Sequence, residues 1–161
     1  QQLFDSENMA ELAAFCTGSL AISAETDAGS GSWEAAACRC LQDLEILEPD
    51  WLALLKQWEQ APELPGFAPQ DPEKLERIAV YFAFRYLLKA VNDGDLLGRA
   101  QFCALGVLVT DRLSRFVGLP EALRLFSREI EHNGDNLDTL LEQFWQTEGL
   151  SLSALLAAFG G

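Results

Sequence analysis

Basic residues are scarce in this chain. Its 161 residues include 11 Lys and Arg against 25 Asp and Glu, a formal net charge of −14 at pH 7. A surface this acidic argues against binding to nucleic acid, whose phosphates need basic side chains, and against adsorption to an anionic membrane. The scarcity is uneven, because residues 1–70 hold only two basic residues whereas residues 71–161 hold nine. The second half of the chain therefore carries nearly all of the positive charge.

Residues that ligate metals or act as nucleophiles are also few. The chain has one histidine and four cysteines, and none of the cysteines forms a CxxC pair. Cys38 and Cys40 form a Cys-x-Cys on a predicted helix, where the two sulfurs point to different sides and chelate poorly. We therefore expect reduced, mostly buried thiols of a cytosolic protein rather than a metal or cluster site. Phosphate-binding loops, GxGxxG, HExxH and GxSxG motifs are absent from the sequence.

Long apolar runs and strand patterns are missing as well. The N-terminus lacks a basic region followed by an apolar one, and no apolar run approaches the ~20 residues of a membrane span. These absences predict a cytoplasmic protein with no membrane partner. No segment alternates apolar and polar residues as a half-buried strand does. With 49% hydrophobic residues the chain is nevertheless globular, so we expect the all-α class.

Two long helical patterns organise the sequence, over residues 72–91 and 96–116. They meet at a turn in which Gly94 supplies a left-handed residue and Asp95 caps the second helix. Both contain stretches that are apolar on every side, residues 78–84 and 102–109, which is typical of buried helices. The pattern predicts an antiparallel helical hairpin at the centre of the fold.

Shorter helical patterns surround this hairpin. They are expected over residues 5–20, 33–47, 49–60, 121–132, 137–149 and from 152 onward. Four of the six prolines lie between residues 61 and 72 and predict a stiff linker. We therefore predict a single all-α domain of about seven or eight helices. Residues 1–60 form its N-terminal helices, 61–71 the linker, and 72–161 the hairpin and C-terminal helices.

A basic stripe runs along the first hairpin helix. Arg77, Tyr81, Arg85 and Lys89 recur every four residues and so share one face. Arg85 sits in an otherwise apolar run, so its guanidinium must reach water, an acidic residue or an anion. One interpretation pairs it with a carboxylate of the chain itself, and the other with a ligand carboxylate or phosphate. The carboxylates considered are those of Asp93, Asp95, Glu129 and Glu131.

A second polar cluster contains the single histidine. Glu129 and His132 stand three residues apart, as in the Glu-x-x-His motif of di-iron bundles. Such bundles need two copies of the motif and two further glutamates, so we expect no metal here. His132 fits a cap that compensates a helix dipole, whereas acid–base catalysis would need a nucleophile that no motif supplies.

Four segments, in this order and spacing, resemble the C-terminal half of the flagellin lysine-N-methylase family. The segments are Leu44-Glu-Ile-Leu47 with Trp51, Tyr81-Phe-Ala-Phe-Arg-Tyr86, Asp93-Gly-Asp-Leu-Leu97, and Phe126-Ser-Arg-Glu-Ile-Glu-His132 with Asn136-Leu137. The resemblance covers about residues 36–144. It implies methyl transfer from S-adenosylmethionine to lysine side chains of flagellin or of another lysine-bearing protein.

The family's other half is rich in cysteine and is associated with an iron–sulfur cluster. Cys16, Cys38 and Cys40 lack that grouped spacing, so we expect no cluster in this chain and a domain incomplete for catalysis alone. The first hypothesis is a methylase-type domain that binds cofactor or substrate in one pocket. The residues proposed around this pocket are Tyr81, Arg85, Lys89, Asp93, Asp95, Glu129 and His132. The alternative is a non-catalytic helical interaction module whose partner is unknown.

Overall fold

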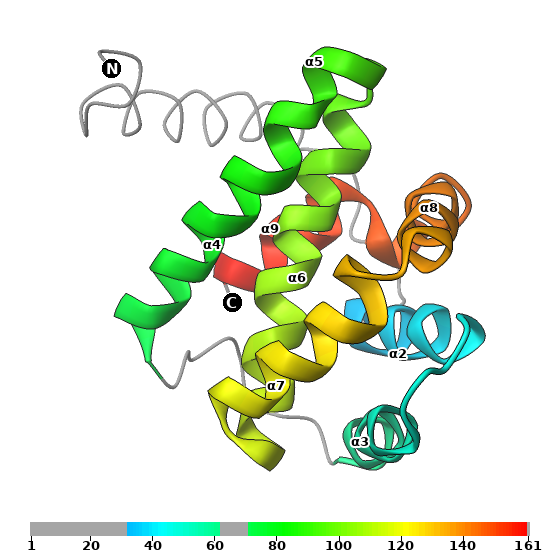
Figure 1. The fold of residues 1–161 in the computed structure, drawn as a ribbon, viewed down its shortest axis with the longest axis vertical. Helices are drawn as coiled ribbons and strands as arrows, with labels where there is room; N and C mark the ends of the chain where they lie inside the picture. The colour runs from blue at the N-terminus through cyan, green and yellow to red at the C-terminus, as the bar shows by residue number, and fades with distance from the viewer. Residues whose placement is uncertain (1–31, 62–70, 161) are drawn as a thin grey trace.

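The computed structural model describes residues 32–61 and 71–160, and within these ranges the chain is helical, with no strand (Figure 1). The elements are α2 (Trp33–Asp43), α3 (Pro49–Gln60), α4 (Pro72–Tyr86), a 3-10 turn (Leu87–Lys89), α5 (Ala90–Asp93), α6 (Leu96–Val117), α7 (Leu119–Phe126), a π-helical turn (Ser127–Glu131), α8 (Gly134–Gln143), a 3-10 turn (Glu148–Leu150) and α9 (Leu152–Gly160). The all-α class and the central hairpin, formed by α4 and α6, are confirmed. The helix predicted over residues 5–20 and most of the predicted linker lie outside the described residues.

Local chemistry sets the helix boundaries where the sequence predicted it would. The Asp71 side chain accepts a hydrogen bond from Lys74 N–H (3.1 Å) and so caps α4. Asp95 caps α6 in the same way. Gly94, between the hairpin helices, has φ 75°, a left-handed conformation that glycine adopts without strain. These caps fix where the two hairpin helices begin and turn.

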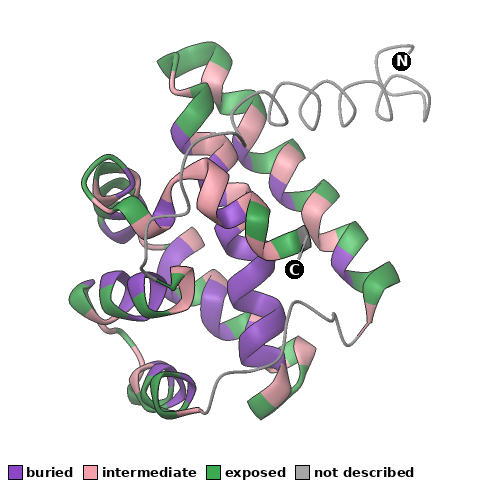
Figure 2. Cartoon of the chain, turned by 180° about the vertical axis from the view of Figure 1, so that it is seen from behind, coloured by how far each residue is buried: buried purple, intermediate pink, exposed green. Residues whose placement is uncertain are grey.

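Helix α6 is the centre of the core. Helices α4, α7 and α9 pack against it, and residues 105–114 are all buried, as the purple stretch in Figure 2 shows. Aromatic rings fill the space between α4, α6 and α7. Tyr86 and Phe102 have ring centroids 4.7 Å apart, and Phe82 and Phe126 5.7 Å apart. The prediction that the second hairpin helix is buried is therefore confirmed.

The corresponding prediction for α4 is wrong. Of its 15 residues only Leu75, Phe82 and Tyr86 are buried. Val80 and Tyr81, both inside the apolar run, remain 44% and 42% exposed. Helix α4 packs on α6 with one side only, and an apolar run does not reveal how many neighbours a helix has.

Two predicted helix ends also differ. Helix α2 ends at Asp43, so Leu47 is a loop residue, 45% exposed, rather than part of a buried stripe. Helix α8 ends at Gln143 and not at Gly149. After α2, backbone groups of the chain form hydrogen bonds with side chains from distant elements, described below. These bonds replace the hydrogen bonds that further helical turns would form. None of the described helices is long and apolar enough to cross a membrane.

Candidate functional site

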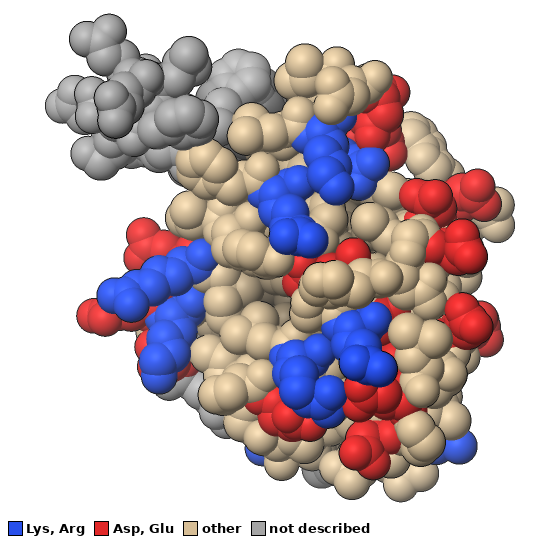
Figure 3. All heavy atoms as spheres, in the orientation of Figure 1, with Lys and Arg blue, Asp and Glu red and all other residues tan. Residues whose placement is uncertain are grey.

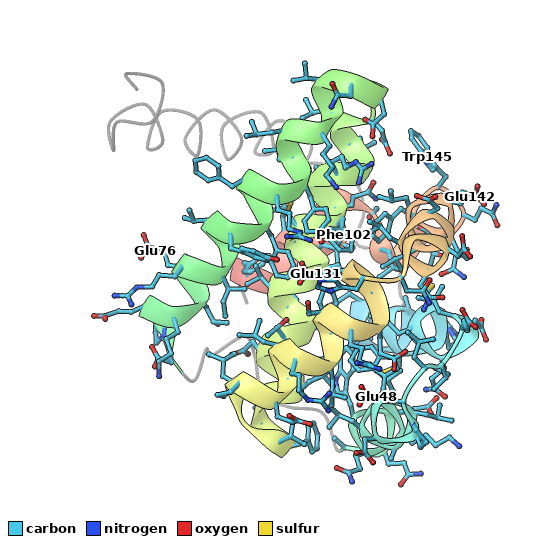
Figure 4. All side chains as sticks on the ribbon, in the orientation of Figure 1. Glu48, Glu76, Phe102, Glu131, Glu142 and Trp145 are labelled. Atoms are coloured by element: carbon cyan, nitrogen blue, oxygen red, sulfur yellow. The ribbon has the colours of Figure 1, made fainter. Side chains whose placement is uncertain are left out.

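A polar cluster forms where α4 meets the π-helical turn after α7. The hydroxyls of Tyr81 and Tyr86 both donate hydrogen bonds to Glu131 Oε2, at 2.7 and 2.8 Å. Arg85 Nε donates to the Tyr86 hydroxyl oxygen (3.2 Å) and lies 3.5 Å from the same carboxylate oxygen. Figure 4 shows Glu131 between α4 and α7. The Glu131 side chain is only 3% exposed, whereas that of Arg85 is 43% exposed. A buried carboxylate thus anchors an arginine that still reaches the surface.

Cations lie over the faces of both tyrosines. The Arg85 guanidinium carbon is 5.9 Å from the Tyr81 ring centroid and 5.8 Å from that of Tyr86. Lys89 Nζ lies 5.2 Å from the Tyr86 centroid. These distances fit cation–π attraction, which orients the two basic side chains along the helix. The cluster therefore presents two positive groups around one negative group.

The environment keeps both phenols protonated. Burial, followed by the hydrogen bond to Glu131 and its charge, raises the pKa of Tyr81 to about 12. The same causes, again led by burial, raise the pKa of Tyr86 further above its ordinary value. At neutral pH the two hydroxyls are therefore hydrogen-bond donors that orient the carboxylate, and neither can serve as a general base.

A widened helical turn determines which glutamate reaches α4. His132 N–H donates to the Ser127 carbonyl oxygen (2.9 Å), a bond that spans five residues rather than four. One such turn holds an extra residue and so rotates the side chains that follow it. Glu129 and Ile130 are buried in the turn, and Glu131 hydrogen-bonds to α4.

Glu129, predicted to share the pocket, has a structural role. It is fully buried, and its two oxygens accept hydrogen bonds from Leu47 N–H (3.0 Å) and Glu48 N–H (2.6 Å). These N–H groups stand at the start of α3, where the helix itself supplies no acceptor and favours a negative charge. Both carboxylate oxygens are thus engaged by the backbone on the α3 side of the molecule.

Asn136 completes this attachment of the loop before α3. Its side chain accepts a hydrogen bond from Glu45 N–H (2.9 Å) and donates to the carbonyl oxygens of Glu45 (2.8 Å) and Glu129 (2.9 Å). Asn136 and Glu129 together satisfy the backbone after α2, which explains why α2 ends early.

The other predicted site residues also bond elsewhere. His132 Nδ1 lies 3.0 Å from the Ser127 carbonyl oxygen and 3.1 Å from its Oγ, so the imidazole closes its own turn. Asp93 accepts a hydrogen bond from Arg99 Nη2 (2.7 Å), and Asp95 accepts one from the N–H of Gly98 in the first turn of α6 (2.8 Å). Of the seven predicted residues, the structure brings together Tyr81, Arg85 and Lys89. Asp93, Asp95, Glu129 and His132 form local or loop-supporting bonds.

Sequence reasoning did not place Tyr86 in the site. A tyrosine within an apolar helical run has a hydroxyl that needs a hydrogen-bond partner once the ring is buried. The position of Tyr86 in such a run therefore could have predicted that it belongs to a polar cluster. Glu131 was one of four carboxylates considered for Arg85, and it is the one that Arg85 contacts. Helical spacing could not select it, because the π-helical turn changes the register.

The described residues contain no group of three or more His, Cys, Asp or Glu side chains arranged to hold a metal ion. Cys38 and Cys40 are buried thiols of α2. Burial, with smaller contributions from nearby carboxylates, raises the pKa of Cys38 to about 12, and burial also raises that of Cys40. Protonated buried thiols are poor nucleophiles and poor metal ligands.

An exposed surface borders the polar cluster, and we call it the α4 face. It extends from α4 over the 3-10 turn to α5. Its aliphatic side chains are those of Val80 on α4, Leu88 in the turn and Val91 on α5, which are 44%, 46% and 87% exposed. Its basic stripe consists of Arg77, Arg85 and Lys89. Figure 3 shows groups of basic side chains on this side of the molecule. Such a combination can receive an apolar segment that carries negative charge.

The chain matches no protein-family model, and it matches no curated protein and no solved structure. What the fold defines is therefore a class, an all-α helical bundle built around the α4–α6 hairpin. The likeness to the flagellin lysine-N-methylase family rests on the segments quoted above.

Proposed function

We propose that this chain is a cytoplasmic, non-catalytic helical interaction module that binds an acidic amphipathic segment of a partner protein along the α4 face. The proposal rests on one observation. Exposed aliphatic side chains and a basic stripe occur together over α4, the 3-10 turn after it and α5, in an otherwise strongly acidic chain.

Apolar exposure supports this function. Burying aliphatic surface contributes about 25 cal/mol per Å² of favourable free energy. Burial of Val80, Leu88 and Val91 by a partner would therefore stabilise a complex. Contiguous exposed apolar residues rimmed by polar ones are typical of interaction sites. An amphipathic helix laid along α4 would cover the aliphatic row with anchors spaced three and four residues apart.

The pairing of charges supports an acidic partner. Within the part of the chain that the structure describes, neither Arg77 nor Lys89 forms an ion pair, and Lys89 lies over the Tyr86 ring. Arg124, by contrast, pairs with both Glu48 and Glu121. Basic groups that remain so weakly neutralised in a chain of net charge −14 favour approach of a negatively charged segment.

Affinity capture from the native cell with matched baits tests the proposal. Leu88→Glu and Val91→Glu place a negative charge on the α4 face at exposed positions, so the fold should persist. Trp145→Glu changes an equally accessible position, 69% exposed, that lies beyond α8 and away from α4 (Figure 4). We expect a partner recovered by the native chain and by Trp145→Glu but lost with Leu88→Glu and with Val91→Glu. Equal recovery by all four baits, or no partner at all, would contradict the proposal.

The resemblance supports a second candidate, a methylase-type domain. Tyr81, Tyr86 and Glu131 converge, and Arg85 Nε donates to the Tyr86 hydroxyl. The Arg85 side chain is still 43% exposed, so its guanidinium can bind the carboxylate of S-adenosylmethionine. Bound there, the cofactor would supply a methyl group for a lysine of flagellin or of another lysine-bearing protein.

Calorimetric titration tests this second function. S-adenosylmethionine and a lysine-rich flagellin peptide are titrated separately into the native chain. Heat that disappears in Arg85→Lys, which loses the bidentate fork but keeps the charge, would support it. Absence of heat for both titrants would eliminate it.

A further inference from the structure

We propose that residues 5–20 of this same chain dock on the α4 face and occupy it in the absence of a partner. The proposal deepens the interaction function and rests on it, because it identifies an internal competitor for the same surface. Residues 5–20 lie outside the described part of the chain, so the argument uses their sequence and the described surface.

The composition of this segment is the one that the α4 face requires. At helical spacing one side of the segment is apolar. The residues of that side are Met9, Leu12, Ala13, Cys16 and Leu20. The segment also holds Asp5, Glu7 and Glu11 and no basic residue. Its apolar side complements the aliphatic side chains of the α4 face, and its acidic groups complement Arg77, Arg85 and Lys89.

The connection is long enough for docking within one molecule. Residues 21–31 join the segment to Ser32, where α2 is capped, and a fully extended chain of this length reaches roughly 35–40 Å. A compact domain of this size has a radius of gyration of about 15 Å, so the tether is about as long as the domain is wide. A tether of this length gives an effective concentration in the millimolar range, which favours the chain's own segment over that of a second copy.

Amide chemical shifts of the full-length chain test the docking. Leu12→Glu places a charge on the apolar side of the segment. Ala10→Glu adds the same charge in the same segment off that side and is the matched control. We expect Leu12→Glu to shift the amide signals of Val80, Leu88 and Val91 and to leave those of α8 unchanged, with no such shifts for Ala10→Glu.

Unchanged α4 signals in Leu12→Glu would overturn the proposal, and so would equal shifts in both variants. Signals of the native chain that change on dilution would show docking between two copies and would overturn docking within one molecule. Affinity capture tests the proposed interaction function, and the chemical shifts test the docking of residues 5–20, so one can give a negative result without the other. A docked segment with no captured partner would remove only the proposed interaction function, and a captured partner with an undocked segment would remove only this inference.

Discussion

Replacing Glu129 is expected to be among the most destabilising single changes to a polar side chain of this protein. Its carboxylate is fully buried, and each oxygen accepts one backbone N–H, that of Leu47 or that of Glu48. Glu129→Ala leaves both donors without an acceptor and opens a small cavity. Glu129→Gln keeps the shape but replaces one acceptor oxygen by an NH2 group that faces a donor.

The magnitudes follow from these two bonds. A hydrogen bond to a charged group contributes about 1.5–3 kcal/mol, and an orphaned buried N–H costs a comparable amount. We expect Glu129→Gln to lower the free energy of unfolding by about 1.5–3 kcal/mol, and Glu129→Ala by about 3–5 kcal/mol. Because small domains are stable by about 5–15 kcal/mol, the alanine variant should approach the limit of folding.

Urea unfolding followed by far-ultraviolet circular dichroism measures this loss. Glu142→Gln is the control, since Glu142 is exposed and its variant should stay within about 0.5 kcal/mol of the native chain. A Glu129→Gln variant as stable as this control would refute the reasoning, because it would show that the carboxylate does not hold the loop before α3. A changed denaturant slope would instead indicate a change in the unfolded or native ensemble.

The remaining predictions concern the tyrosine cluster and the core glycine. The chain has only two tyrosines, Tyr81 and Tyr86, so phenolate absorbance reports both, and we expect neither to ionise near pH 10. Their contribution to stability should be complete below pH ~10, the ordinary tyrosine pKa, and should fall as the pH rises through about 12. Glu131→Gln should lower the pKa of both tyrosines, but not to the ordinary tyrosine value, because the burial of the rings remains. An unchanged titration would disprove that the Glu131 charge raises these pKa values. Gly106→Ala should lower the free energy of unfolding by about 1–3 kcal/mol in thermal or urea unfolding, because its Cβ would lie 3.0 Å from an aromatic ring of α4. The control is Gly134→Ala, whose Cβ would meet nothing within 4 Å, so its stability should be unchanged or slightly higher. Equal stabilities for the two alanine variants would contradict this close packing of α4 on α6.

The polar cluster could be predicted only in part. The four-residue spacing of Tyr81, Arg85 and Lys89 placed them on one face, and the structure keeps them together. The same reasoning grouped Glu129 with them. It failed there because the side chain bonds to backbone groups more than 80 residues earlier in the chain. No spacing within a helix contains information about that contact.

The sequence by itself determined the local features of this protein. The helical class, the caps at Asp71 and Asp95 and the left-handed turn at Gly94 follow from interactions within a few residues, which the amino-acid order specifies directly. Only the tertiary structure decided that α4 is covered on one side while residues 105–114 of α6 are covered all round, since burial depends on which elements pack against a helix. It also decided that Glu131 and not Glu129 reaches Arg85, because the widened turn and the distant loop together rotate the two carboxylates toward different neighbours.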